Sequence, residues 1–140
     1  NEINLLDICL KEDLLLSTAN IAPLSHWITP NIESRRFDTR FFIAYLPEKQ
    51  IVEHDGLELT QSLWINPNKA VEMAFKGEMQ MIMPTIKNLQ SCSEFEVAKD
   101  MLDSQKRLTN KDIPPILPKF FKENGNWVGL LPGDDGYEDH

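Results

Sequence analysis

Residues 21–46 read IAPLSHWITPNIESRRFDTRFFIAYL, and the rest of the chain is expected to pack around this stretch. Aromatic and branched residues from Ile21 to Thr29 favour a β-strand, which Pro30 ends because proline lacks a backbone N–H donor. From Phe37 to Leu46 the apolar residues fall on both sides of an extended chain, which is typical of a strand covered on both faces. We therefore expect residues 37–46 to form the central strand of a sheet.

Two helix starts are marked by capping residues. Asn66 followed by Pro67 predicts an N-cap with proline at the first helical position, and Gly77 predicts the end of that helix. Ser93 and Glu96 have the spacing of a capping box, in which each side chain bonds the other residue's backbone amide. This pattern predicts a second helix that begins at Ser93 and continues to about residue 105.

The other expected elements follow from local patterns. The turn residues 54–56 precede a predicted strand over residues 57–65, and Asn124-Gly125 predicts a tight hairpin turn because both positions favour positive φ angles. The remaining predicted segments are a helix over residues 2–15 with Ile3 on its apolar side, a short helix over residues 84–92, and hairpin strands over residues 119–123 and 127–131.

Length and composition predict one domain. The chain has 140 residues, of which 41% are hydrophobic and 26% charged, as in an ordinary globular protein. Mixed strands and helices in this order favour an α/β (α+β) fold. We expect an N-terminal helix and connection in residues 1–20, the sheet and helices in residues 21–131, and a loose acidic tail in residues 132–140.

The charge and the apolar runs exclude several classes of partner. The formal net charge of -8 disfavours nucleic acid, whose phosphates would be repelled. The longest apolar runs fall short of the roughly 20 residues that span a bilayer, and no signal-like segment opens the chain. We therefore expect a cytoplasmic protein with neither a nucleic-acid nor a membrane partner. Cys9 and Cys92 lack metal-ligand spacing and are predicted to be free thiols.

Three groups of segments form a recognisable set. They are His26–Pro30 with Arg35–Phe42, His54–Glu58 with Leu63–Ile65 and the helix from Pro67, and Met83–Thr85 with Leu131–Asp134 and Tyr137. The most specific is HWITP followed by RRFDTRFF, and together the segments cover roughly residues 21–137. This set resembles the Nudix hydrolase superfamily, in the branch of the coenzyme A diphosphatases.

The resemblance implies a partial Nudix-like α/β/α sandwich with a mixed sheet. It also implies a MutT-like hydrolase that uses Mg²⁺ or Mn²⁺ to cleave a diphosphate within a nucleoside diphosphate derivative, of which coenzyme A is one example. Carboxylates one helical turn apart suit that chemistry because they can hold hard cations. The family's acidic box is absent, however, because these residues contain no Arg-Glu or Glu-Glu pair.

In the family this box precedes the His-Trp segment. We therefore expect it upstream of Asn1 in a longer parent, which is also consistent with the missing initiator methionine. The 140-residue chain alone is predicted to be inactive, with no metal or other cofactor bound by itself.

Four residues are candidates for the site. Glu58 resembles an auxiliary catalytic or metal-binding acid, and the alternative is a solvated glutamate at a strand start. Arg35, Arg36 and Arg40 offer paired donors that suit substrate phosphates, and the alternative is an internal salt bridge to Asp38. Strand parity predicts that the side chains at positions 36, 38 and 40 share one face.

The other conspicuous side chains favour structural roles. We expect His26 to be packed or capping, while the tryptophans should anchor the core or an interface. The methionines are expected to fill the core, with an apolar groove as the alternative. These residues are Trp27, Trp64 and Trp127, and Met73, Met79, Met81 and Met83.

Two further interpretations stay open. In the first, the chain is a non-catalytic Nudix-like module for binding or assembly, and an unpaired sheet edge favours a homodimer. In the second, it is an accessory domain of a larger metallohydrolase.

Overall fold

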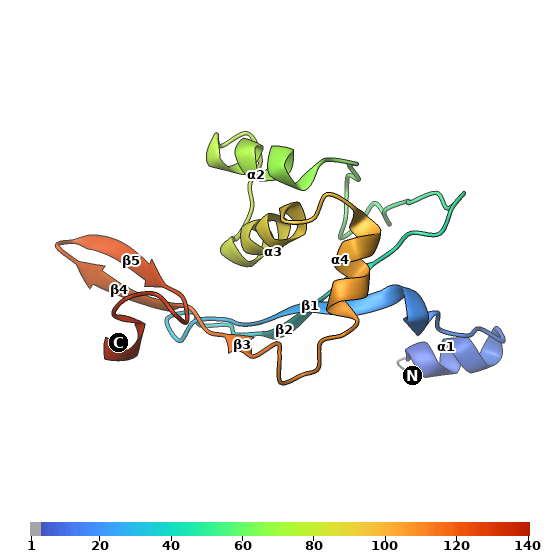
Figure 1. Ribbon diagram of the computed structural model, residues 1–140, viewed down its shortest axis with the longest axis horizontal. Coiled ribbons are helices and arrows are strands. Elements are labelled where there is room, and N and C mark those ends of the chain that lie inside the picture. The colour runs from blue at the N-terminus through green and yellow to red at the C-terminus, as the bar shows by residue number, and fades with distance from the viewer. Residues whose placement is uncertain (1–3) are drawn as a thin grey trace.

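The computed structural model describes residues 4–140, so the predicted position of Ile3 lies outside the described residues. β1 (Ile21–Ile28) is the middle strand of a three-stranded sheet, between antiparallel β2 (Asp38–Ala44) and parallel β3 (Pro115–Ile116). β4 (Lys119–Glu123) and β5 (Asn126–Leu130) form a separate hairpin (Figure 1). The mixed α+β class is therefore confirmed.

The two strands within residues 21–46 form as expected, but their places in the sheet differ from the prediction. β1 matches the predicted strand to within one residue, and β1, rather than β2, is central. Phe42 of β2 is 59% exposed. The prediction of a central strand over residues 37–46 was wrong because an apolar run does not reveal whether both faces have neighbours within the same chain.

Side chains alternate between the two faces of the β1–β2 pair. Ser25 pairs with Phe41 and Trp27 with Thr39, and these residues line cavities beneath the helices. His26 pairs with Arg40 on the opposite face. The sheet therefore has one helix-covered face and one opposite face, and we keep these two names below.

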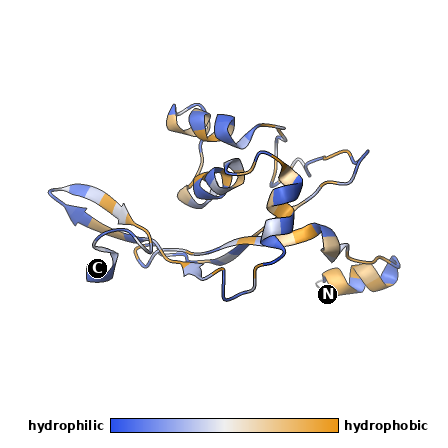
Figure 2. Cartoon of the chain, in the orientation of Figure 1, coloured by the Kyte–Doolittle hydropathy of each residue, from blue (hydrophilic) through white to orange (hydrophobic). Residues whose placement is uncertain are grey.

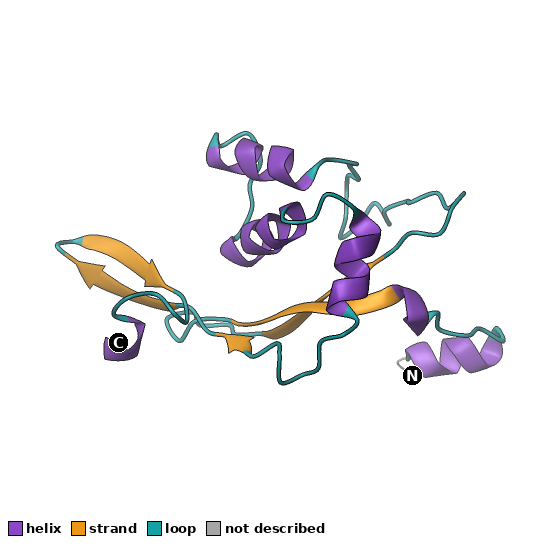
Figure 3. Cartoon of the chain, in the orientation of Figure 1, coloured by secondary structure: helices purple, strands orange, loops and turns teal. Residues whose placement is uncertain are grey.

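Three helices lie on one side of this sheet, and two of them contact it while the first packs on the second. α2 (Pro67–Phe75), α3 (Met83–Ser93) and α4 (Ala98–Gln105) lie on the same side of it, whereas α1 (Leu5–Lys11) lies beyond the end of β1 (Figures 1 and 3). Within residues 4–140, no helix lies against the opposite face. Each helix in this part of the chain is also too short or too polar to traverse a lipid bilayer.

The start and end of α2 confirm the capping prediction. The Asn66 side chain accepts a hydrogen bond from the backbone N–H of Asn68 at 2.9 Å, and Pro67 is the first helical residue. Gly77 follows the helix with a φ of 75°, a left-handed conformation that favours glycine. Both signals lie within a few residues of the feature they specify.

The predicted capping box at Ser93 was wrong. Ser93 is the last residue of α3, and its Oγ donates to the carbonyl of Gln90 at 2.6 Å. α4 begins at Ala98 instead, after Val97, which provides no side-chain cap. A serine hydroxyl can bond backwards to a helical carbonyl as readily as it caps a new helix. The short helix expected over residues 84–92 is present as α3.

The turn at residues 54–56 forms, but the strand expected after it does not. Asp55 accepts hydrogen bonds from the amides of Leu59 at 2.9 Å and Leu57 at 3.0 Å, which lowers the pKa of the Asp55 carboxyl. Residues 57–65 are irregular, and Trp64 is 78% exposed. Alternating apolar residues do not produce a strand without a neighbouring strand to bond.

The hairpin β4–β5 confirms the Asn-Gly prediction. Asn124 and Gly125 have φ angles of 49° and 83°, as a turn with two positive φ angles requires. Across the hairpin, the ring of Phe120 lies over Gly129, where an added Cβ would come within 2.6 Å of the ring. Glycine at this position therefore allows the aromatic ring to lie flat on the neighbouring strand.

The C-terminal residues differ from the loose tail expected over residues 132–140. Tyr137 is buried, and its hydroxyl donates to the carbonyl of Leu117 at 2.8 Å. Lys119 places its ammonium over the Tyr137 ring, and His140 stacks on Phe121 with centroids 3.6 Å apart. The acidic composition of residues 132–140 did not predict these contacts, because their partners Leu117, Lys119 and Phe121 lie elsewhere in the sequence.

The core is small for a chain of this size. Its buried apolar residues are Ala22, Trp27, Ala70, Met101, Leu102 and Tyr137. Many large hydrophobic residues are instead exposed to solvent, including those of α1 (Figure 2). The total accessible surface is 11,577 Å², whereas a compact monomer of 16.1 kDa is expected to expose roughly 7,400 Å². This surplus is of the size that an extensive interface buries.

Candidate substrate-binding site

A cavity of about 520 Å³ lies beside the connection between β1 and β2, and Arg35 is part of its wall. We call it the Arg35 cavity. Its lining comes from β1, β2, the start of α3 and β4, and is predominantly apolar. The residues used below are Trp27, Glu33, Arg35, Phe37, Phe41 and Phe120. An apolar cavity with a few charged groups is typical of a small-molecule site.

Hydrogen bonds hold the connection that carries Arg35. The backbone N–H of Thr29 donates to the carbonyl of Phe37 at 2.9 Å. The Thr29 hydroxyl accepts from the Phe37 amide at 2.9 Å, and Arg36 Nε donates to the Thr29 carbonyl at 2.9 Å. The Arg35 guanidinium carbon lies 5.0 Å from the Phe37 ring centroid. The guanidinium is thus oriented beside an aromatic wall.

The three candidate arginines do not lie together. Arg35 lines the cavity and Arg36 bonds the end of β1, whereas Arg40 pairs with His26 on the opposite face. β2 begins only at Asp38, so strand parity applies to positions 38 and 40 and does not extend to position 36. The phosphate-binding roles of the three arginines stay predictions.

Asp38 contacts histidine instead of arginine. The imidazole Nε2 of His26 lies 2.5 Å from Asp38 Oδ1, and His26 is 7% exposed while the Asp38 side chain is mostly exposed. Within residues 4–140, no salt bridge joins Asp38 to an arginine. The packed position of His26 agrees with its expected structural role. Sequence reasoning missed the His26–Asp38 pair, because the two residues lie on neighbouring strands that are joined by the β1–β2 connection.

Glu58 is exposed and does not line the Arg35 cavity. It lies in the irregular segment immediately after the Asp55 turn. Its role as an auxiliary acid stays a prediction.

The residues between 4 and 140 do not fit a divalent metal centre. No three of their histidine, cysteine, aspartate and glutamate side chains converge on one point. Among the acids of α4, Asp103 already contacts Lys99 within the helix. A magnesium ion needs several oxygen ligands, so it would require further groups from outside residues 4–140.

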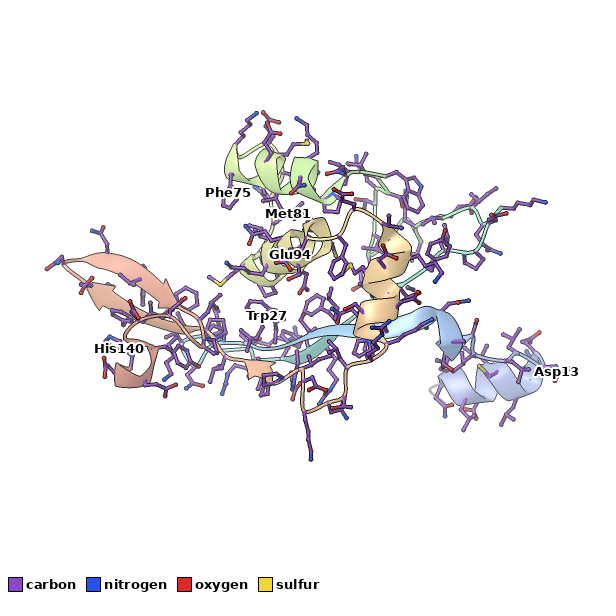
Figure 4. All side chains as sticks on the ribbon, viewed as in Figure 1. Asp13, Trp27, Phe75, Met81, Glu94 and His140 are labelled. Atoms are coloured by element: carbon purple, nitrogen blue, oxygen red, sulfur yellow. The ribbon has the colours of Figure 1, made fainter. Side chains whose placement is uncertain are left out.

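A polar network that the sequence did not reveal links β1 to α3. Trp27 Nε1–H donates to Ser25 Oγ at 3.1 Å, and Ser25 Oγ donates to Asn88 Oδ1 at 2.7 Å. These residues line a second cavity of about 310 Å³, which we call the Asn88 cavity. Figure 4 shows Trp27 on the side of the sheet that faces α3. Trp27 lines both cavities and is 4% exposed.

Comparisons with known proteins identify relatives over most of the chain. It is 30% identical over 120 residues to the Xenopus laevis protein "Acyl-coenzyme A diphosphatase NUDT19" and 29% identical over 115 residues to the human protein of that name, covering 81% of this chain in both cases. It is also 27% identical over 122 residues to the Caenorhabditis elegans protein "Putative nudix hydrolase 7", covering 86% of this chain.

The matched part is a fraction of each relative. It spans 31% of the Xenopus and human proteins and 40% of the Caenorhabditis elegans protein. No protein-family model matches the chain. No solved structure matches it either. The similarities agree with a Nudix-like relationship, and the resemblance predicted from the segments around His26 is confirmed at that level.

Proposed function

We propose that this chain is part of a longer Nudix hydrolase that cleaves diphosphate linkages in nucleoside diphosphate derivatives of the coenzyme A type. The observation that carries this proposal is the similarity of 81% of the chain to proteins named acyl-coenzyme A diphosphatases. The chain spans about a third of their length, so the activity is assigned to the longer polypeptide.

The Arg35 cavity supports a substrate-binding role for this chain. The guanidinium of Arg35 offers paired N–H donors that match phosphate oxygens, and it is held beside the Phe37 ring. The apolar wall that includes Phe41 and Phe120 would accept an uncharged part of the substrate. Glu33 shares the cavity and would exclude an anion from its own side, so the phosphate is expected next to Arg35.

The other candidate residues receive secondary roles. Arg40 lies on the opposite face next to the His26–Asp38 pair, where it would meet a phosphate or an acid brought by the rest of the polypeptide. Arg36 helps to hold the connection that carries Arg35. Glu58 is proposed as an auxiliary acid that acts only when other acids are brought next to it.

We further propose that the acids that bind Mg²⁺ or Mn²⁺ come from another part of the longer polypeptide. Two observations support this. No group of acids in residues 4–140 could hold the metal, and no helix within these residues lies against the opposite face of the sheet. An α/β/α sandwich needs a helical layer on each face. The same missing segment could therefore supply both the layer and the acids.

A hydrolysis assay tests this function. With acyl-coenzyme A and magnesium, the full-length polypeptide is expected to release nucleotide products, while the 140-residue chain shows no turnover. Arg35→Gln in the full-length protein should raise KM about tenfold with kcat nearly unchanged, because a binding contact is removed. Arg107→Gln, at an exposed position outside the cavity, is the matched control.

Two outcomes would contradict the proposal. Turnover by the 140-residue chain would overturn the assignment of the metal site to another segment. An inactive full-length protein, tested on coenzyme A, acyl-coenzyme A and ADP-ribose with either metal, would remove the catalytic assignment.

Two observations favour the alternative of a non-catalytic module for assembly. The surplus of exposed surface and the free edge of β2 both suit pairing with a second copy. Sedimentation of the full-length protein separates the two cases. A monomer that hydrolyses acyl-coenzyme A supports the enzyme, whereas an inactive dimer supports the assembly module.

A further inference from the structure

One buried donor in the Asn88 cavity has no partner among residues 4–140. Trp27 Nε1 can only donate, so Ser25 Oγ accepts from it and keeps its own proton free to donate. That proton goes to Asn88 Oδ1 at 2.7 Å, which fixes the orientation of the amide. Asn88 is 9% exposed, and its Nδ2 is left without a hydrogen-bond partner in the part of the chain that the structure describes. Rotating the amide by 180° would leave the Ser25 proton without this acceptor.

An unpaired buried amide is unfavourable enough to indicate a missing partner. Folding removes the Asn88 amide from water. A buried donor without an acceptor destabilises the folded state by more than a typical hydrogen bond stabilises it. The orientation of Asn88 is also fixed from the sheet side by Ser25 and Trp27. The partner must therefore present an acceptor oxygen on the side of the amide nitrogen.

The charged residues around the Asn88 cavity indicate which kind of acceptor it would bind. Lys87 and Glu94 both line it, so a positive and a negative side chain face the same space. Gln90 and Ser91 add neutral groups that can both donate and accept. An anion would gain little from so balanced a wall, whereas a secondary amide offers a carbonyl to Asn88 Nδ2 and an N–H to Glu94, Gln90 or Ser91.

We propose that the Asn88 cavity binds a secondary amide of a small-molecule ligand, with Asn88 Nδ2 donating a hydrogen bond to the amide carbonyl. The choice of ligand rests on the proposed function, because the pantetheine arm of coenzyme A contains secondary amides. Trp27 forms a wall of both cavities. One extended ligand can therefore place its amide arm against Asn88 and its phosphate near Arg35.

Nuclear magnetic resonance of the full-length protein tests this site directly. Pantetheine should shift the side-chain amide signals of Asn88 and the indole N–H signal of Trp27 in a saturable manner. Adenosine 3′,5′-diphosphate, which lacks the amide arm, should leave the Asn88 signals unchanged. Absence of a pantetheine-induced shift at Asn88 would overturn the inference.

A variant that exchanges one atom of the side chain gives a second test. Asn88→Asp keeps the acceptor for Ser25 and replaces the unpaired donor by an oxygen, so pantetheine affinity should fall about tenfold. Asn110→Asp makes the same change at an exposed turn and should bind pantetheine normally. Equal affinity of both variants and the unchanged protein would count against the site. If Asn88→Asp does not fold, the signals of the unchanged protein decide.

The two proposals can fail separately. Hydrolysis of acyl-coenzyme A without a pantetheine-induced shift at Asn88 would overturn this inference and leave the proposed function standing. Pantetheine binding at Asn88 in a protein without hydrolase activity would do the reverse. Nuclear Overhauser contacts between the side-chain amide protons of Asn88 and a segment from outside the 140 residues would show that polypeptide occupies the cavity, which also overturns the inference.

Discussion

Both faces of the β1–β2 pair carry a large aromatic residue, but the surroundings of these two residues differ. On the helix-covered face, Trp27 is 4% exposed and tied through Ser25 to α3. On the opposite face, Phe42 is 59% exposed, and no helix within residues 4–140 covers it. A large aromatic residue left open on a sheet indicates a surface that is completed by something else. Among residues 4–140, helices therefore lie over only one face of the sheet.

The largest effect is expected on the helix-covered face. Trp27→Ala should lower the free energy of unfolding by about 3–5 kcal/mol, because it empties the space between β1 and α3 and removes the donor to Ser25. Trp64→Ala, at an exposed indole, should change it by less than about 0.5 kcal/mol. Chemical denaturation of the full-length protein checks both values. Similar losses in the two variants would break the distinction between covered and exposed tryptophans.

A smaller effect should distinguish the 140-residue chain from the proposed longer polypeptide, at the opposite face of the sheet. Phe42→Ala should change the stability of the 140-residue chain by less than about 0.5 kcal/mol, because the ring is mostly exposed there. In the full-length protein the same change should cost about 2 kcal/mol, since a covering layer would bury the ring. Phe75→Ala, on the exposed part of α2, is the control. Equal losses in both proteins would mean that nothing covers this face.

The smallest effect concerns the reactivity of the half-buried Cys92 thiol on α3. Burial raises the pKa of the Cys92 thiol, so less of it is thiolate at pH 8 than in an unfolded chain, and alkylation by iodoacetamide should be slower. The stability that burial of the neutral thiol contributes is present below the ordinary thiol pKa and is lost as the pH rises through the folded value. Mass spectrometry of Cys92 at pH 7 to 10, with and without denaturant, measures this. An equal rate in both states would show that α3 and α4 leave the thiol open.

Local signals in the sequence predicted local structure well. Asn66-Pro67 gave the start of α2 and Asn124-Gly125 the hairpin turn, because each acts through atoms only a few residues away. Ser93 was misassigned, since its hydroxyl had two local partners and the sequence does not choose between them. The irregular segment 57–65 shows the same limit for strands, which depend on a neighbour elsewhere in the chain.

Some residues of the candidate site could be predicted from the sequence, and others could not. Arg35 could be proposed from its residue type, and it lies on the wall of the largest apolar cavity among those described beside β1. Asn88 could not be proposed, because its meaning depends on Ser25, 63 residues earlier in the chain. The position of β2 at the edge of the sheet could not be predicted from the sequence either. An apolar strand has the same residue pattern whether the strand or layer that covers it comes from this chain or from another polypeptide segment.

The position of Trp27 between the two cavities gives the protein an internal optical reporter. Its indole is shielded, whereas Trp64 and Trp127 are 78% and 61% exposed, so iodide should suppress the emission of the outer pair and leave that of Trp27. Because the indole lines both the Arg35 cavity and the Asn88 cavity, a molecule that binds in either one would shift the emission wavelength of Trp27. Ligand occupancy could thus be followed without attaching a dye.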